Sequence, residues 1–124
     1  MREIAGRATV AGDAGFAEVR RPRVADGDSY RAMARAYVRG QRQDGWEEHD
    51  DVVERFDAAV VRHAATAAAG NSTLVVGTHG MVSTLWLAGR YQLRPGREQF
   101  WEALRFPDLI EIDLVSGAVT RPLP

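Results

Sequence analysis

The feature that most constrains this sequence is an apolar, β-branched run that leads through a short polar turn into a helical pattern. The run is Thr73–Gly77, the turn is Thr78-His79-Gly80, and the helical pattern covers Met81–Ala88. A continuous apolar run of this length is typical of a strand that is buried on both faces of a parallel sheet. The sequence therefore predicts a central strand, with His79 between its end and the start of a helix.

This junction has the properties of an anion site. A helix that starts directly after a parallel strand presents unpaired backbone N–H groups and the positive end of its dipole. Gly80 has no Cβ to block a close approach, and the imidazole of His79 can donate to a phosphoryl oxygen or move a proton near neutral pH. We expect phosphate or a phosphoester to bind at His79, Gly80 and Met81. The alternative is that His79 is a polar residue that only caps the helix.

Helical and extended patterns alternate along the rest of the chain. The predicted helices cover 30–38, with Ser29 as N-cap, 52–67 and about 100–104, and the predicted strands cover 8–11, 109–114 and 118–121. Residues 2–6 have the pattern of the last turn of a helix, and 19–27 has that of a loop. Such alternation predicts an α/β fold with three layers, α/β/α, and a largely parallel sheet. With 124 residues, 45% of them hydrophobic, the chain suits a single domain, 1–124.

Composition excludes several classes of function. The formal net charge is −1, so no overall basic field attracts nucleic acid or an anionic membrane. No stretch approaches the roughly 18–20 apolar residues of a membrane span, so we expect a soluble protein. The sequence has no cysteine, which excludes disulfides, thiolate catalysis and cysteine-based zinc sites and is compatible with a cytoplasmic location.

Charged residues near the N-terminal third and in the long helix are candidates for catalysis and phosphate binding. Glu18 is either a general acid or a solvated carboxylate paired with Arg20 or Arg21. Arg20, Arg21 and Arg23 either contact a phosphate or keep the loop hydrated, and hydration is favoured. Arg55 lies on the flank of the apolar stripe of the 52–67 helix, where it either reaches inward or stays in solvent.

No metal site and no cofactor site are predicted. The acidic run Glu47–Asp51, which includes His49, has metal-binding residue types, but consecutive helical residues point around the axis and cannot converge on one ion. These acids fit better as first-turn residues that stabilise the helix dipole. His63 lies on the apolar stripe, which indicates a hydrogen-bonded core histidine rather than a ligand.

Four segments, taken in order, resemble the histidine phosphatase superfamily, also called phosphoglycerate-mutase-like. They are Phe16-Ala17-Glu18-Val19, Trp46-Glu47-Glu48 ahead of Glu54-Arg55-Phe56, Leu74–Gly80, and Phe100-Trp101 ahead of Pro107. The resemblance implies a phosphomonoester hydrolase or phosphomutase fold in which His79 corresponds to the second active-site histidine. Glu18 then falls on the acid for the leaving oxygen, and Arg55 on a recurring arginine of the helix before the strand.

One departure from the family governs the functional prediction. The family's nucleophilic histidine belongs to an Arg-His-Gly motif on the first strand, and this sequence has no such motif. The other two histidines, His49 and His63, lie in a helical pattern, and Arg62-His63-Ala64 stands in the wrong kind of element. We therefore expect an incomplete domain that is inactive as a single chain. The alternative is a non-catalytic phosphate-binding or dimerisation module.

The missing strand has a structural consequence. It would leave the strand over Leu74–Thr78 with an unpaired edge, which predicts a rearranged sheet or a homo-oligomer formed through that edge. A third hypothesis treats strand-His-Gly as the oxyanion-hole segment of an α/β-hydrolase. It is disfavoured because no Gly-x-Ser-x-Gly nucleophile elbow follows.

Overall fold

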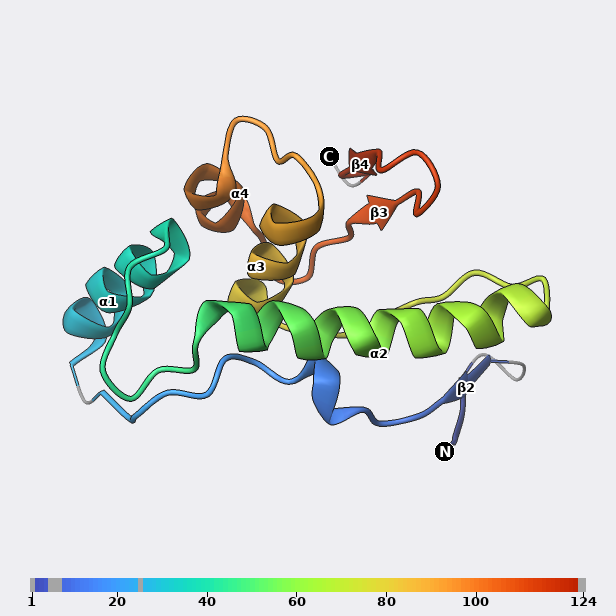
Figure 1. The fold of residues 1–124 in the computed structure, drawn as a ribbon, viewed down its shortest axis with the longest axis horizontal. Coiled ribbons are helices and arrows are strands. Elements are labelled where there is room, and N and C mark those ends of the chain that lie inside the picture. The colour runs from blue at the N-terminus through green and yellow to red at the C-terminus, as the bar shows by residue number, and fades with distance from the viewer. Residues whose placement is uncertain (1, 5–7, 25, 123–124) are drawn as a thin grey trace.

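Helices form most of the regular structure in the computed structural model, which describes residues 2–4, 8–24 and 26–122 (Figure 1). The described elements in chain order are β1 (Arg2–Ile4), β2 (Ala8–Val10), the 3-10 helix η1 (Ala14–Phe16), α1 (Gly27–Arg39), α2 (His49–Ala69), α3 (Gly80–Arg90), α4 (Arg97–Ala103), β3 (Glu111–Ile112) and β4 (Val119–Thr120). No helix among the described residues is long and apolar enough to cross a lipid bilayer.

The long helix α2 is the base on which the other elements pack. Its buried residues Val52, Phe56, Ala59 and Val60 recur at helical spacing, so the predicted helix over 52–67 is confirmed. Figure 1 shows α3 standing on one side of α2, while the N-terminal segment runs along another side. One helix therefore contacts both segments that carry candidate site residues.

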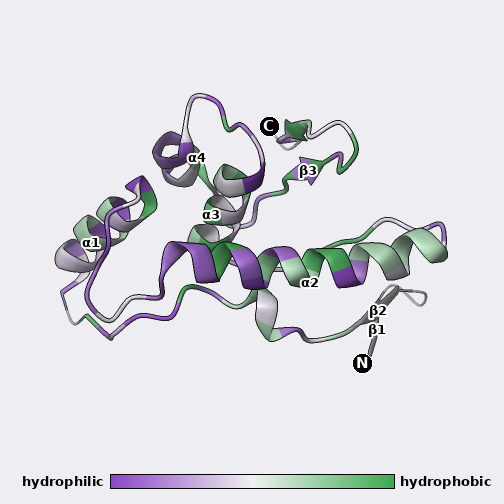
Figure 2. Cartoon of the chain, in the orientation of Figure 1, coloured by the Kyte–Doolittle hydropathy of each residue, from purple (hydrophilic) through white to green (hydrophobic). Residues whose placement is uncertain are grey.

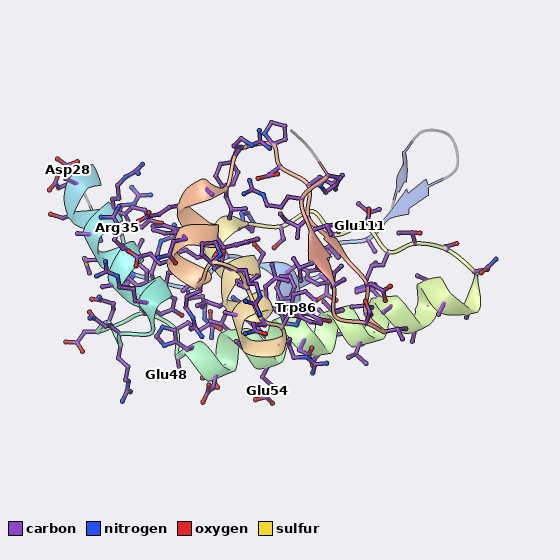
Figure 3. The ribbon with its side chains drawn as sticks, turned by 90° about the horizontal axis from the view of Figure 1, so that it is seen from above. Asp28, Arg35, Glu48, Glu54, Trp86 and Glu111 are labelled. Carbon is purple, nitrogen blue, oxygen red and sulfur yellow. The ribbon has the colours of Figure 1, made fainter. Side chains whose placement is uncertain are left out.

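The core lies where α3 meets α2. Every residue of α3 from Met81 to Leu87 is buried except Ser83, and Trp86 contacts the ring of Phe56 with centroids 5.1 Å apart. The indole Nε1 of Trp86 donates to Asp57 at 3.0 Å, so this large side chain is both packed and hydrogen-bonded. In Figure 2 the strongly hydrophobic residues gather on α3 and on the turns of α2 near it. Figure 3 shows Trp86 over α2, whereas Glu48 and Glu54 point outward.

Ion pairs connect α1 to α4. Arg35 Nε lies 2.8 Å from a carboxylate oxygen of Glu102, and Arg39 Nη2 lies 2.8 Å from one of Glu98 (Figure 3 labels Arg35). The predicted N-cap of α1, Ser29, is wrong. The N-cap is Asp26, whose carboxylate accepts from the backbone N–H groups of Asp28 and Ser29.

The predicted three-layer α/β/α fold with a largely parallel sheet is wrong. The described residues form two separate antiparallel pairs, β1 with β2 and β3 with β4. The segments expected to flank the central strand are paired with their own neighbours in sequence and not with residues 73–77. Residues 73–79 are not a strand, and Val75 is 82% exposed. Below, residues 73–78 are called the unpaired segment.

Two smaller expectations also need correction. Residues 2–4 form β1 rather than the end of a helix, and the remaining residues of that prediction, 5 and 6, lie outside the described ranges. Helix α3 continues beyond the predicted end at Ala88 to Arg90, so Gly89 lies inside it. Its missing Cβ allows Val53 of α2 to approach, since a Cβ there would lie 3.1 Å from a methyl group of Val53.

Candidate functional site

Glu18 and the start of α3 are in direct contact. Glu18 Oε2 accepts a hydrogen bond from the backbone N–H of Met81 at 3.2 Å, and Oε1 accepts from Val82 at 2.8 Å and from Val19 at 2.9 Å. The N–H groups of Met81 and Val82 lie in the first turn of α3, where no helix carbonyl is available to them. A carboxylate of the chain itself therefore occupies the helix start that the sequence predicts as an anion site.

His79 lies at the N-cap position of α3, with its side chain exposed. The alternative that His79 only caps the helix agrees with the structure in position, because His79 is the N-cap residue, but its imidazole makes no capping hydrogen bond. Its backbone carbonyl instead accepts from the hydroxyl of Ser83 at 2.6 Å. The neighbouring Thr78 donates its hydroxyl to the carbonyl of Phe16 at 2.8 Å. This bond ties the unpaired segment to η1, and the His79 side chain remains exposed to solvent.

Arg55 reaches inward from α2 rather than into solvent. Its guanidinium donates to both carboxylate oxygens of Glu47, at 2.8 and 3.0 Å, and to the backbone carbonyls of Gly15 at 2.8 Å and Glu18 at 3.2 Å. One arginine thus holds the segment that carries Glu18 against α2. These four bonds leave one of the five N–H groups of the guanidinium, on Nη1, for a phosphate oxygen.

Glu47 is the acidic partner of Arg55, and the sequence did not predict this role. The sequence favours Glu47 as a first-turn acid of the helix, but Glu47 precedes the N-cap Glu48, and its side chain is only 2% exposed. Burial raises the pKa of Glu47, but hydrogen bonds from Arg55 and from the backbone N–H of Arg20 outweigh that effect and leave the pKa lowered. The hydrogen bond to Glu47 raises the pKa of Arg55 in turn. One sequence feature could have indicated that Glu47 is buried: it directly follows Trp46, a large apolar residue.

The structure thus brings the Glu18 carboxylate to Gly80–Val82, at the start of α3. Arg55 binds the backbone carbonyl of Glu18 from α2. The hypothesis that Glu18 pairs with Arg20 or Arg21 is wrong. Arg20 Nη2 lies 3.3 Å from Glu47, and Arg21 Nη1 donates to the carbonyl of Val19 at 2.9 Å.

The other two histidines, which both lie on α2, each have a hydrogen-bond partner from another part of the chain. His63 Nε2 lies 2.8 Å from Asp13, and its ring lies against Phe16 with centroids 5.7 Å apart, so it is a hydrogen-bonded, half-buried histidine. His49 Nε2 lies 2.7 Å from the carbonyl oxygen of Tyr37. In both histidines Nε2 is engaged, and both lie away from the start of α3 on the helix α2. Within the described ranges, no group of three or more His, Cys, Asp or Glu side chains is arranged to hold a metal ion.

Comparison with known proteins adds no family to this description. No protein-family model, no curated protein and no solved structure matches the chain. The chemistry of the site therefore has to be inferred from its own geometry.

Proposed function

We propose that this chain is a module that binds phosphate or a phosphomonoester at the start of α3 and does not hydrolyse it as a single chain. The observation that carries the proposal is that the Glu18 carboxylate accepts from the N–H groups of Met81 and Val82, at a helix whose N-cap residue, His79, has an exposed side chain. An oxyanion of the chain already uses these donors, so their orientation suits an oxyanion from solution.

In this proposal the Glu18 carboxylate binds the N–H groups of Met81 and Val82 when no ligand is present. A phosphate dianion carries more charge than a carboxylate and more acceptor oxygens, so it can replace Glu18 at Met81 and Val82 and also accept from His79. Glu18, once displaced, remains next to the bound group, where the resemblance to histidine phosphatases puts the acid for a leaving oxygen. Hydrolysis is not expected, because His49 and His63 are engaged elsewhere and no free histidine faces His79 as a nucleophile.

Two assays test this function together. Titration calorimetry with inorganic phosphate at constant ionic strength should show saturable binding that weakens about tenfold or more in His79→Ala, because a charge-assisted donor is lost. Gln92→Ala, an exposed substitution in the loop after α3, should bind as the wild type does. A phosphatase assay should show no turnover. Absence of saturable binding, or hydrolysis that His79→Ala abolishes, would contradict the proposal.

Self-association is a second candidate function, supported by the unpaired segment. Val75 is 82% exposed, and the run from Asn71 to Thr78 contains no charged residue, so two copies can align there without charge repulsion. We infer a homodimer in which this segment pairs with its copy. Sedimentation equilibrium should show a dimer that Val75→Lys dissociates, while Val61→Lys, at another exposed valine, leaves it intact. A wild-type monomer at all concentrations would exclude this function.

We also propose a cytoplasmic location, because the sequence has no cysteine and no apolar stretch of membrane-spanning length.

A further inference from the structure

A cleft of about 600 Å³ opens beside the segment that carries Glu18. It is lined by one short stretch of chain and one aromatic residue from α1, namely Glu18, Val19, Arg20, Arg21, Pro22, Arg23, Val24 and Tyr30. Its size falls within the range of roughly 300–1,000 Å³ that is typical of small-molecule sites. Three of its eight lining residues are arginines, which is the feature that indicates a ligand.

The charge of this cleft is only partly neutralised by the chain. Arg20 is paired with Glu47, and Glu18 is engaged with α3. Arg21 and Arg23 have no carboxylate partner within the part of the chain that the structure describes. Two guanidinium groups in the cleft therefore remain available to an external anion.

Tyr30 fixes the position of one of these groups. The guanidinium carbon of Arg21 lies 5.1 Å from the centre of the Tyr30 ring, and one of its nitrogens donates to the carbonyl of Val19 at 2.9 Å. Tyr30 is itself stacked against buried Trp46, with centroids 6.2 Å apart. A guanidinium held by a ring and a carbonyl is preorganised, so less conformational entropy is lost when its remaining N–H groups bind an anion.

We propose that this cleft is a second anion site, which binds a phosphoryl dianion through Arg21 and Arg23. A phosphate monoester carries about −1.5 to −2 charges near neutral pH, which matches two unpaired guanidinium groups. The planar guanidinium fork binds phosphate oxygens in a bidentate manner. A nucleic acid is a poorer fit, because the chain as a whole has a formal net charge of −1 and the three arginines of the cleft come from one short stretch of chain.

This inference does not depend on binding at the start of α3. Glu18 is the one residue that both places share, and the donors are different: guanidinium groups in the cleft, backbone N–H groups and His79 at the helix. A ligand with two phosphoryl groups can occupy both places, but a single phosphate is sufficient to test the cleft.

The test is an NMR titration of the intact chain with inorganic phosphate, compared with acetate, at ionic strength held constant with chloride. Phosphate should give saturable shifts of the Arg21 and Arg23 side-chain Nε–H signals and of the amides around them. The double variant Arg21→Gln/Arg23→Gln should raise the Kd measured from the backbone amide shifts at least about tenfold. Arg94→Gln, at an exposed arginine in the loop between α3 and α4, is the matched control and should leave the Kd unchanged.

The outcomes separate the two sites. Saturation of the cleft signals without any shift at Gly80–Val82 would support the cleft and contradict binding at α3, and the reverse result would overturn the cleft. The cleft would also be excluded if acetate bound as tightly as phosphate, or if the double variant kept the wild-type Kd. Tyr30→Ala provides an independent check on the same cleft. It should weaken binding because Arg21 loses its support, whereas Tyr30→Phe should not.

Discussion

Glu47 is a shared partner of several polar contacts around the site. Its carboxylate accepts from the side chains of Arg55 and Arg20 and from the backbone of Arg20, while its backbone carbonyl accepts from the buried hydroxyl of Tyr37 at 2.7 Å. Burial raises the pKa of Tyr37, so this hydroxyl stays a donor. A single residue therefore joins α1, α2 and the segment that carries Glu18.

Removal of this carboxylate should be costly. Glu47→Ala leaves the guanidinium of Arg55 without its acidic partner, and a broken buried pair costs on the order of 3 kcal/mol in the free energy of unfolding. Urea denaturation measures this loss. Glu48→Ala is the matched control, because the Glu48 side chain is 53% exposed and pairs with the exposed Arg42 at 2.5 Å, and exposed pairs contribute about 1 kcal/mol or less. Equal losses in the two variants would show that Glu47 does not have this role.

Asp13 should contribute to stability in acid. The backbone N–H of Gly15, followed by Arg62 and His63, lowers its pKa from 3.8 to about 2. The folded chain thus favours the ionised carboxylate, and the resulting stabilisation is present above pH 3.8 and is lost as the pH falls toward 2. Asp13→Asn keeps an acceptor for the Gly15 N–H but does not titrate.

The measurement is the free energy of unfolding of both proteins across this pH range. The difference between wild type and Asp13→Asn should shrink as the pH falls, because other carboxylates titrate equally in both proteins. A difference that stays constant down to pH 2 would contradict the lowered pKa.

Among the contacts between elements, the crossing of η1 over α2 most restricts which residues the fold can accept. A Cβ on Gly15 would lie 2.7 Å from the Cβ of Ala59 and 2.9 Å from the backbone carbonyl oxygen of Arg55, so the two backbones can approach only because Gly15 has no side chain. The crossing brings Glu18 to α3, which makes it a structural requirement of the site.

Gly15→Ala should therefore destabilise the chain by about 1–3 kcal/mol, as overpacked sites do. Gly12→Ala, three residues earlier, has nothing within 4 Å of its added Cβ and should be nearly neutral. Thermal unfolding of the two variants checks this. Similar melting temperatures for both would mean that η1 does not lie this close to α2.

Helices were predictable from this sequence because their signals are local. The apolar spacing of α2 and the pattern after Gly80 each depend on residues within a few turns, and both helices are present. The 73–77 run was predicted as a strand for its composition, but a strand also needs a neighbour for its N–H and C=O groups. No sequence pattern identifies which segment provides that neighbour.

For the whole molecule, the candidate site was partly predictable. The sequence order placed Glu18 and Arg55 with the His79 turn, and the structure brings Glu18 to the start of α3. The inward orientation of Arg55 was not predictable, because its guanidinium also donates to the carbonyls of Gly15 and Glu18, which are 40 and 37 residues away in the sequence. Long-range hydrogen bonds of this kind arise from tertiary packing and have no periodic signal in the sequence.

The most direct test of the proposed site follows the backbone amides of Met81 and Val82 during a phosphate titration of wild type and Glu18→Gln. Replacing the charged carboxylate with a neutral amide of the same size removes the internal competitor. We predict saturable amide shifts in the wild type and a severalfold lower Kd in Glu18→Gln. Amides of Met81 and Val82 that do not respond to phosphate in either protein would show that Glu18 is a permanent structural cap and that the start of α3 is not a ligand site.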